Sequence, residues 1–125
     1  MKMNKLELSE YTCSAHVALK AASTMVTHRT PVIFVTDNYK MTRHAVKTTD
    51  VHLMKDENFA LITLDGLSSF SVEDITAASV FVFGGVDIDT TLLNIIAHSS
   101  DESVGISIHR VGKVQPRSDY AKVED

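Results

Sequence analysis

The chain has little cysteine and no long apolar segment, and each of these features excludes a class of structure. Cys13 is the single cysteine among 125 residues, so an internal disulfide is excluded. No stretch approaches the roughly 18 consecutive apolar residues of a membrane span, and residues 1–10 lack the apolar core of a signal peptide. We therefore expect a protein without a membrane span, located in the cytoplasm.

An excess of positive charge is also missing. The chain has 12 Lys and Arg residues against 16 Asp and Glu residues, which gives a formal net charge of -4. Duplex nucleic acid is bound largely by neutralising its phosphates with basic side chains, so the composition argues against a duplex-binding domain. A local basic patch remains compatible with these counts.

What is present is the composition of a folded domain. Hydrophobic residues make up 44% of the chain and charged residues 22%, unlike the profile of a disordered protein. A length of 125 residues fits one hydrophobic core better than two. We expect a single α/β domain over residues 1–112 and a polar tail over residues 113–125, where little can be buried.

Short apolar runs and helical spacings predict the elements. The expected buried strands are residues 32–35, 59–64, 79–83 and 104–110. Ser9 is the expected N-cap of a helix over residues 10–28, and Ser71 with Asp74 opens a short helix that ends at Ala78. Asp87 or Asp89 opens a third helix over residues 88–98. Residues 39–58 fit neither period, and because threonine favours extended backbone we interpret residues 39–55 as one or two exposed strands.

The order strand, helix, strand, helix, strand between residues 59 and 111 predicts right-handed crossovers. The expected fold is a three-layer α/β domain, with a mostly parallel or mixed sheet of four to five strands flanked by about three helices. Ligands of such sheets bind beyond the carboxyl ends of the strands. The expected core consists of Leu19, Val32, Phe34, Leu61, Ile62, Val80, Val82, Leu93 and Ile96.

Glycine and arginine at the expected strand ends indicate a site for an anion. The backbone of Gly84 and Gly85 can approach a phosphate closely, and arginine offers a planar, permanently charged fork for phosphate or carboxylate. In the alternative interpretation, Gly84 and Gly85 only make a tight turn, Phe81 and Phe83 are core residues, and Arg110 is solvated. The candidate ligand-binding residues are Arg110, His109, Gly84, Gly85, Phe83, Asn94, Asp65 and Arg43.

Two segments resemble parts of known families. Residues 87–92 resemble the Asp-x-Asp-x-Thr-Leu signature of haloacid-dehalogenase-type phosphatases, which implies Asp87 as nucleophile and Asp89 as acid and base. Helix capping by aspartate accounts for the same residues. Residues 73–83 are similar to the helix-into-strand segment of fructose-type phosphotransferase IIB domains, whose phosphorylated cysteine would correspond to Cys13. The alternative for Cys13 is a buried structural thiol.

No motif specifies a metal site or an α/β-hydrolase serine, so we expect no metal and no cofactor. The leading hypothesis is a non-catalytic binding protein that senses or sequesters a small anionic ligand such as a nucleotide. The alternatives are a small protein-interaction or inhibitory module, of the kind found as phage or mobile-element accessory proteins, and a phosphate-handling enzyme. Apolar residues between positions 39 and 55 lie outside the expected helix-covered faces, which predicts a homo-oligomer.

Overall fold

The computed structural model describes residues 5–97 and 103–112 of the chain. Its strands form one five-stranded sheet in the order β1-β5-β4-β2-β3, in which every neighbouring pair is parallel. The strands are β1 (Lys5–Cys13), β2 (Val32–Thr36), β3 (Phe59–Ile62), β4 (Ser79–Phe83) and β5 (Ser103–Val111). The predicted α/β class is confirmed.

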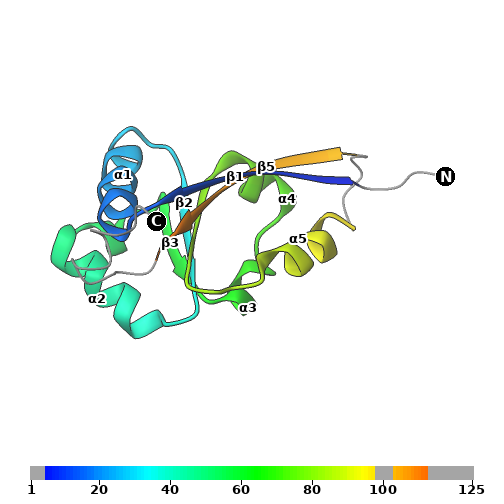
Figure 1. Ribbon diagram of the computed structural model, residues 1–125. Helices are drawn as coiled ribbons and strands as arrows, with labels where there is room; N and C mark the ends of the chain where they lie inside the picture. Colours follow the sequence, from blue (N-terminus) through cyan, green and yellow to red (C-terminus); the bar gives the residue numbers. More distant parts are fainter. Residues whose placement is uncertain (1–4, 98–102, 113–125) are drawn as a thin grey trace.

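Helices cover both faces of this sheet. They are α1 (Ala15–Thr27), α2 (Tyr39–Thr49), α3 (Leu64–Leu67), α4 (Val72–Ala77) and α5 (Ile88–Ile96), with a 3-10 turn η1 (Leu53–Lys55) after α2. Helices α1 and α2 lie on one side of the sheet, and α3, α4 and α5 lie on the other (Figure 1). The predicted three layers are present, with five α-helices among the described residues in place of about three.

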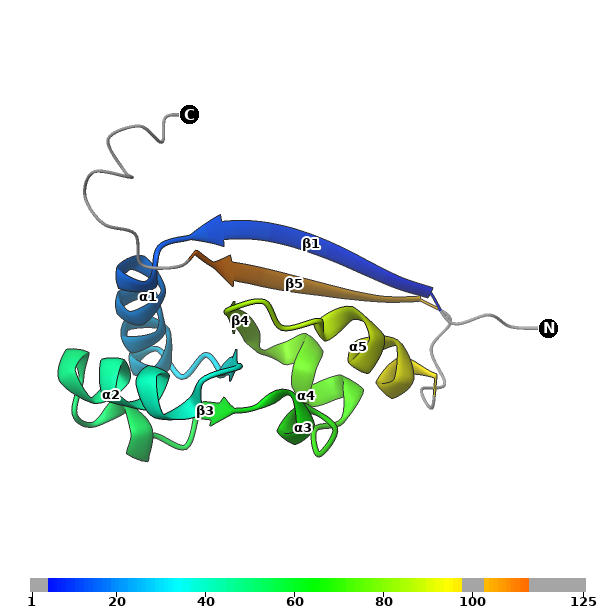
Figure 2. The ribbon, with the colours of Figure 1, turned by 60° about the horizontal axis from the view of Figure 1, so that its bottom comes forward.

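The connections diverge between β2 and β4. The chain leaves β2 toward β3 on one side, and it leaves β4 toward β5 on the other side. This order corresponds to the flavodoxin-like order, with β2 in the first place and the N-terminal strand β1 in the last. The two longest strands, β1 and β5, run side by side at that edge (Figure 2). Ligand clefts of doubly wound sheets form where the connections diverge, which here is beyond the carboxyl ends of β2 and β4.

The predicted helix over residues 10–28 is wrong in its first part. Residues 10–13 belong to β1, which pairs with β5 along its whole length, and α1 begins only after Ser14. The Ser14 hydroxyl is the N-cap and accepts a hydrogen bond from the Val17 N–H at 3.2 Å. Pairing with a strand almost a hundred residues away in sequence therefore outweighs the local helical pattern.

The predicted strands over residues 39–55 are wrong. This segment forms α2 and η1, and Asn38 caps α2 by accepting a hydrogen bond from the Met41 N–H at 3.2 Å. Thr42 is buried inside the helix, where its hydroxyl donates to the Asn38 carbonyl at 3.0 Å and lies 2.7 Å from the Thr36 hydroxyl. Thr42 is therefore accommodated in a helix by burial and by its hydrogen bonds, although a β-branched side chain disfavours helical backbone. The predicted strand over residues 59–64 is too long at its end, because β3 stops at Ile62 and Leu64–Leu67 form α3.

Most of the predicted core is confirmed, but one position in α5 is wrong. Leu93 is 49% exposed, whereas Leu92 is fully buried. The inner face of α5 consists of Ile88, Leu92 and Ile96, which follow one another at the four-residue spacing of a helix face. Ile62 is half-buried against the same core, and the other predicted core residues are buried.

Some expectations concern other parts of the chain or the molecule as a whole. The predicted tail over residues 113–125 lies outside the described residues. The short helix after Ser71 is confirmed as α4, with a capping box between Ser71 and Asp74. Within residues 5–97 and 103–112, no helix has both the length and the apolarity needed to cross a membrane.

Candidate functional site

The carboxyl ends of β2 and β4 meet through Asp37 and the two glycines. Gly84 has a φ of 84°, and a side chain at this position would collide with the Asp37 carboxylate. The N–H of Gly85 donates to Asp37 Oδ2 at 3.3 Å. The backbone that we expected to face an anionic ligand is therefore paired with a carboxylate of the chain itself.

Arg110 is held at the same edge by three oxygen atoms. Its Nη1 donates to the Val86 carbonyl at 3.1 Å, and its Nη2 lies 3.6 Å from Glu10 Oε2 and 3.6 Å from Asp89 Oδ1. Two carboxylates compensate the positive charge of the guanidinium, and the Val86 carbonyl uses one of its donors. This arrangement connects β1, β5 and the start of α5, and it leaves the arginine little free charge for a ligand.

The two aspartates of the phosphatase-like segment both lie at the start of α5. Asp87 is the N-cap residue, and its carboxylate accepts a hydrogen bond from the Thr90 hydroxyl at 3.5 Å. Asp89 lies in the first turn and is paired with Arg110. Negative charge at this end of a helix is favoured by the helix dipole, which gives both residues a structural role.

His109 and Phe83 lie on the opposite face of the sheet from Arg110. The His109 ring stacks between Tyr11 and Phe81, with centroid separations of 5.2 Å and 4.6 Å. Burial lowers the pKa of His109 below its ordinary value of 6.5. Phe83 packs against Phe34 at 4.7 Å, within the core below α1 and α2. Phe81 and Phe83 share this face, because side chains alternate between the two faces along a strand.

The other predicted residues are divided between three places. Asp65 and Asp37 line a mostly apolar hollow of about 300 Å³ at the carboxyl ends of β2 and β3, together with Val86. The structure thus brings Asp65, Gly84, Gly85 and Arg110 to one edge of the sheet. Asn94 is exposed on α5, and Arg43 is exposed on α2.

Arg43 belongs to a group of basic residues that the sequence analysis missed. Five exposed side chains of α2 line a hollow of about 600 Å³, which we name the α2 basic groove. Its residues are Tyr39, Lys40, Arg43, His44 and Lys47. Spacings of three and four residues place the basic side chains on one face of the helix. The signal that could have revealed them is Asn38, a favoured N-cap residue, because it allows residues 39–49 to be interpreted as a helix.

No acidic residue belongs to α2. Across the two described stretches, no carboxylate lies within ion-pairing distance of Lys40, Arg43 or Lys47. This contrasts with Arg110, which has two carboxylates beside it. The α2 basic groove is therefore a place where free positive charge is concentrated.

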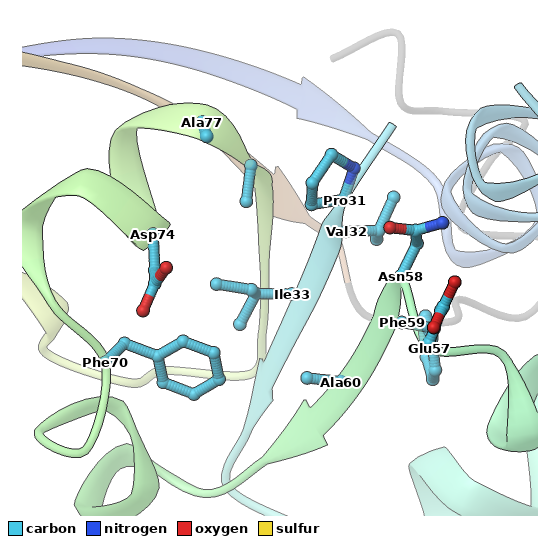
Figure 3. A pocket seen from close by; sticks show the side chains of 11 residues that line it. Pro31, Val32, Ile33, Glu57, Asn58, Phe59, Ala60, Phe70, Asp74 and Ala77 are labelled. Atoms are coloured by element: carbon cyan, nitrogen blue, oxygen red, sulfur yellow. The ribbon is translucent and has the colours of Figure 1, made fainter. Parts of the chain in front are cut away.

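A third hollow lies at the amino ends of β2 and β3, beside α4. It has a volume of about 200 Å³ and includes Ile33, Ala60 and Phe70 in its lining, with Glu57 and Asp74 contributing carboxylates (Figure 3). In Figure 3, Phe70 and Asp74 lie across from Ala60 and Glu57. We name this feature the β3 hollow. No pattern in the sequence predicts this hollow, because its lining comes from three separate segments.

The residues that the structure describes support neither a metal site nor an activated cysteine thiol. There, no three or more His, Cys, Asp or Glu side chains are grouped so that they could hold a metal ion. Cys13 ends β1, and burial raises the pKa of its thiol. A raised pKa disfavours the thiolate that a nucleophilic or phosphorylated cysteine needs.

Comparison with known proteins adds nothing to these observations. Searches of family models, curated proteins and solved structures give no match for this chain. The two resemblances seen in the sequence remain confined to the short segments that carry them. The function has to be inferred from the geometry and the charge of the chain itself.

Proposed function

We propose that the protein is a non-catalytic binding protein for a small anionic ligand such as a nucleotide, and that the α2 basic groove binds this ligand. The observation that carries the proposal is that Lys40, Arg43 and Lys47 have no carboxylate partner among the described residues, in a chain whose formal net charge is -4. Like charges at these spacings destabilise a helix by about 0.2–0.5 kcal/mol per pair. A bound anion offsets that cost, which is a physical reason for these like charges to lie on one face of α2.

The side chains of the groove suit phosphate groups. Arg43 offers two parallel donors to phosphate oxygens, and the lysines act as mobile point charges. From Lys40 to Lys47 the helix rises about 10 Å, so a ligand with two or more charged groups can contact both ends. Tyr39 is 40% exposed at one end and offers a ring on which a base can stack. The hollow that these side chains line has a volume of about 600 Å³.

The carboxyl edge of the sheet supports an anionic ligand less well. Its glycine backbone is occupied by Asp37, Arg110 is paired with Glu10 and Asp89, and Asp65 adds a further negative charge. An anion would have to displace a carboxylate and would meet its repulsion. Of the residues predicted from the sequence, the proposal therefore retains Arg43.

Calorimetric titration with adenosine diphosphate tests the proposal, at about 0.15 M salt so that only short-range charge contributes. Arg43→Gln should weaken binding about tenfold or more, which corresponds to about 1.4 kcal/mol. Lys55→Gln is the matched control, because Lys55 is an exposed basic residue on η1 outside the groove. Neither substitution should change the melting temperature appreciably, since exposed charges contribute little to folding. Equal affinity of wild type and Arg43→Gln would reject the proposal.

A further inference from the structure

The sheet ends at β3, and among the described residues no strand pairs with its outer edge. β3 pairs with β2 from Val32↔Phe59 to Val35↔Ile62, and the Asn58 carbonyl accepts from the Val32 N–H at 2.8 Å. Alternate residues of a strand direct their backbone groups to opposite edges, so Ala60 bonds toward β2 and Leu61 faces outward. The N–H and C=O of Leu61 therefore make no backbone hydrogen bond among the described residues.

The β3 hollow lies directly beside this free edge. Ala60 and Ile33 are register partners, so their side chains point to the same face of the sheet, toward α4. Because Ala60 is small, the space between β3, Phe70 and α4 is left unfilled (Figure 3). The residue of an added strand that lies opposite Ala60 would direct its side chain into this apolar space.

The rim of the hollow is acidic. Glu57 and Asp74 line it and are exposed, and each has an exposed or half-buried acidic neighbour in sequence, Asp56 and Glu73. Across residues 5–97 and 103–112, no basic side chain lies within ion-pairing distance of these four carboxylates. Lysine or arginine on an incoming segment would find a carboxylate without a described ion-pair partner on each side of the hollow, Glu57 on one side and Asp74, which also caps α4, on the other.

We propose that the free edge of β3 captures an extended peptide segment of a protein partner, which places one large apolar side chain in the β3 hollow and Lys or Arg on either side of it. The backbone of Leu61 would supply strand pairing, and the hollow and its rim would supply selectivity, as in other cases of strand addition. β3 has four residues, so only a short segment can pair with it. This interaction is separate from the α2 basic groove and corresponds to the protein-interaction module considered from the sequence.

A synthetic probe peptide tests the proposal. Fluorescein-labelled Thr-Lys-Thr-Phe-Thr-Lys-Thr, with capped ends, has Phe and both Lys on one face of an extended strand. Fluorescence anisotropy should show saturable binding to the wild-type protein. Replacing Phe by Ala, or both Lys by Glu, should each weaken binding about tenfold or more. Two further peptides carry N-methyl groups on one or the other alternate set of nitrogens, and the peptide whose methylated nitrogens face β3 should lose binding, since strand pairing needs those N–H groups.

Variants of the protein provide the complementary test. Ala60→Leu fills the hollow and Glu57→Gln removes one rim charge, so both should weaken binding of the probe. Asp65→Asn, at the opposite end of the sheet, is the matched control for charge and should bind like wild type. The methylated peptide keeps the proposal falsifiable if Ala60→Leu fails to fold. Absence of binding, or equal binding of the Phe and Ala peptides, would overturn the proposal.

Discussion

His109 is held between the rings of Tyr11 and Phe81, and its burial makes stability depend on pH. Because its pKa is lowered from 6.5, the unfolded chain takes up a proton more readily than the folded one. The stability associated with the neutral ring is thus complete above pH 6.5 and is lost as pH falls from 6.5 toward the lower folded-state pKa.

His109→Phe removes this titration and retains an aromatic ring in the stack. Between about pH 7.5 and pH 5.5 the unfolding free energy of wild type should fall relative to that of the variant, as measured by urea denaturation. The other histidines are common to both proteins, so they cancel in the difference. A difference that does not change with pH would show that the His109 ring is as well solvated in the fold as in the unfolded chain.

Two adjacent leucines of α5 give a direct test of the packing. Leu92 is fully buried and Leu93 is 49% exposed. Leu92→Ala should reduce the unfolding free energy by about 2–5 kcal/mol, because it removes buried apolar contacts and leaves a cavity. Leu93→Ala is the control and should cost about 0.5 kcal/mol or less, as surface substitutions usually do. Equal losses in chemical denaturation would mean that α5 is rotated relative to its position here.

At the scale of elements, α1 ends in an unusual way. Arg29 has a φ of 63°, a left-handed conformation that favours glycine. Its N–H donates to the Val26 carbonyl at 2.9 Å, and the Thr30 N–H donates to the Met25 carbonyl at 2.9 Å. These two bonds form a Schellman motif with arginine in the position usually taken by glycine.

Arg29→Gly should therefore stabilise the protein by up to about 1 kcal/mol, because it relieves the cost of a left-handed side chain. Arg29→Ala separates this effect from loss of the charge, since alanine retains the unfavourable conformation. Its unfolding free energy should remain within about 0.5 kcal/mol of wild type. An alanine variant more stable than the glycine variant in urea denaturation would contradict the assignment of strain to this residue.

The elements that the sequence predicts well are those whose signals are local. The apolar runs that became β2, β3 and β4 are bounded by polar or glycine residues, and α4 begins with a capping box. β1 was missed because its strand character depends on pairing with β5, which no local pattern reveals. α2 was missed because Thr42, Thr48 and Thr49 lower helix propensity, although Thr42 is stabilised by burial and by its bond to Asn38.

At the scale of the whole molecule, the structure removes the main reason for predicting a homo-oligomer, which was that the apolar residues between positions 39 and 55 lie outside the helix-covered faces. Val46 and Leu53 pack into the core below α2 instead of forming an exposed strand, while Met41 and Val51 are 69% and 59% exposed. The oligomer stays a prediction, now with these exposed side chains as its only support from this segment. Light scattering at micromolar concentration should give a mass of at least two chains. A single species at 13.7 kDa would contradict it.

The positions of the candidate site residues could be predicted from the sequence, but the pairing of their charges could not. Position at the strand ends can be inferred from the sequence, and Asp65, Gly84, Gly85 and Arg110 do lie at one edge. The pairing of Arg110 with Glu10, and of Gly85 with Asp37, depends on contacts between distant segments. The uncompensated basic side chains instead collect on α2, where their common face becomes visible only once the segment is known to be helical.

The most direct measurement is a nuclear magnetic resonance titration of the backbone amides with adenosine diphosphate. It compares the α2 basic groove with the carboxyl edge of the sheet in one experiment, without any substitution. Saturable shifts should be largest for Lys40, Arg43, His44 and Lys47, and small for Gly84, Gly85 and Arg110. Shifts concentrated at Gly84, Gly85 and Arg110, or no saturable shift at any residue, would contradict the assignment of ligand binding to α2.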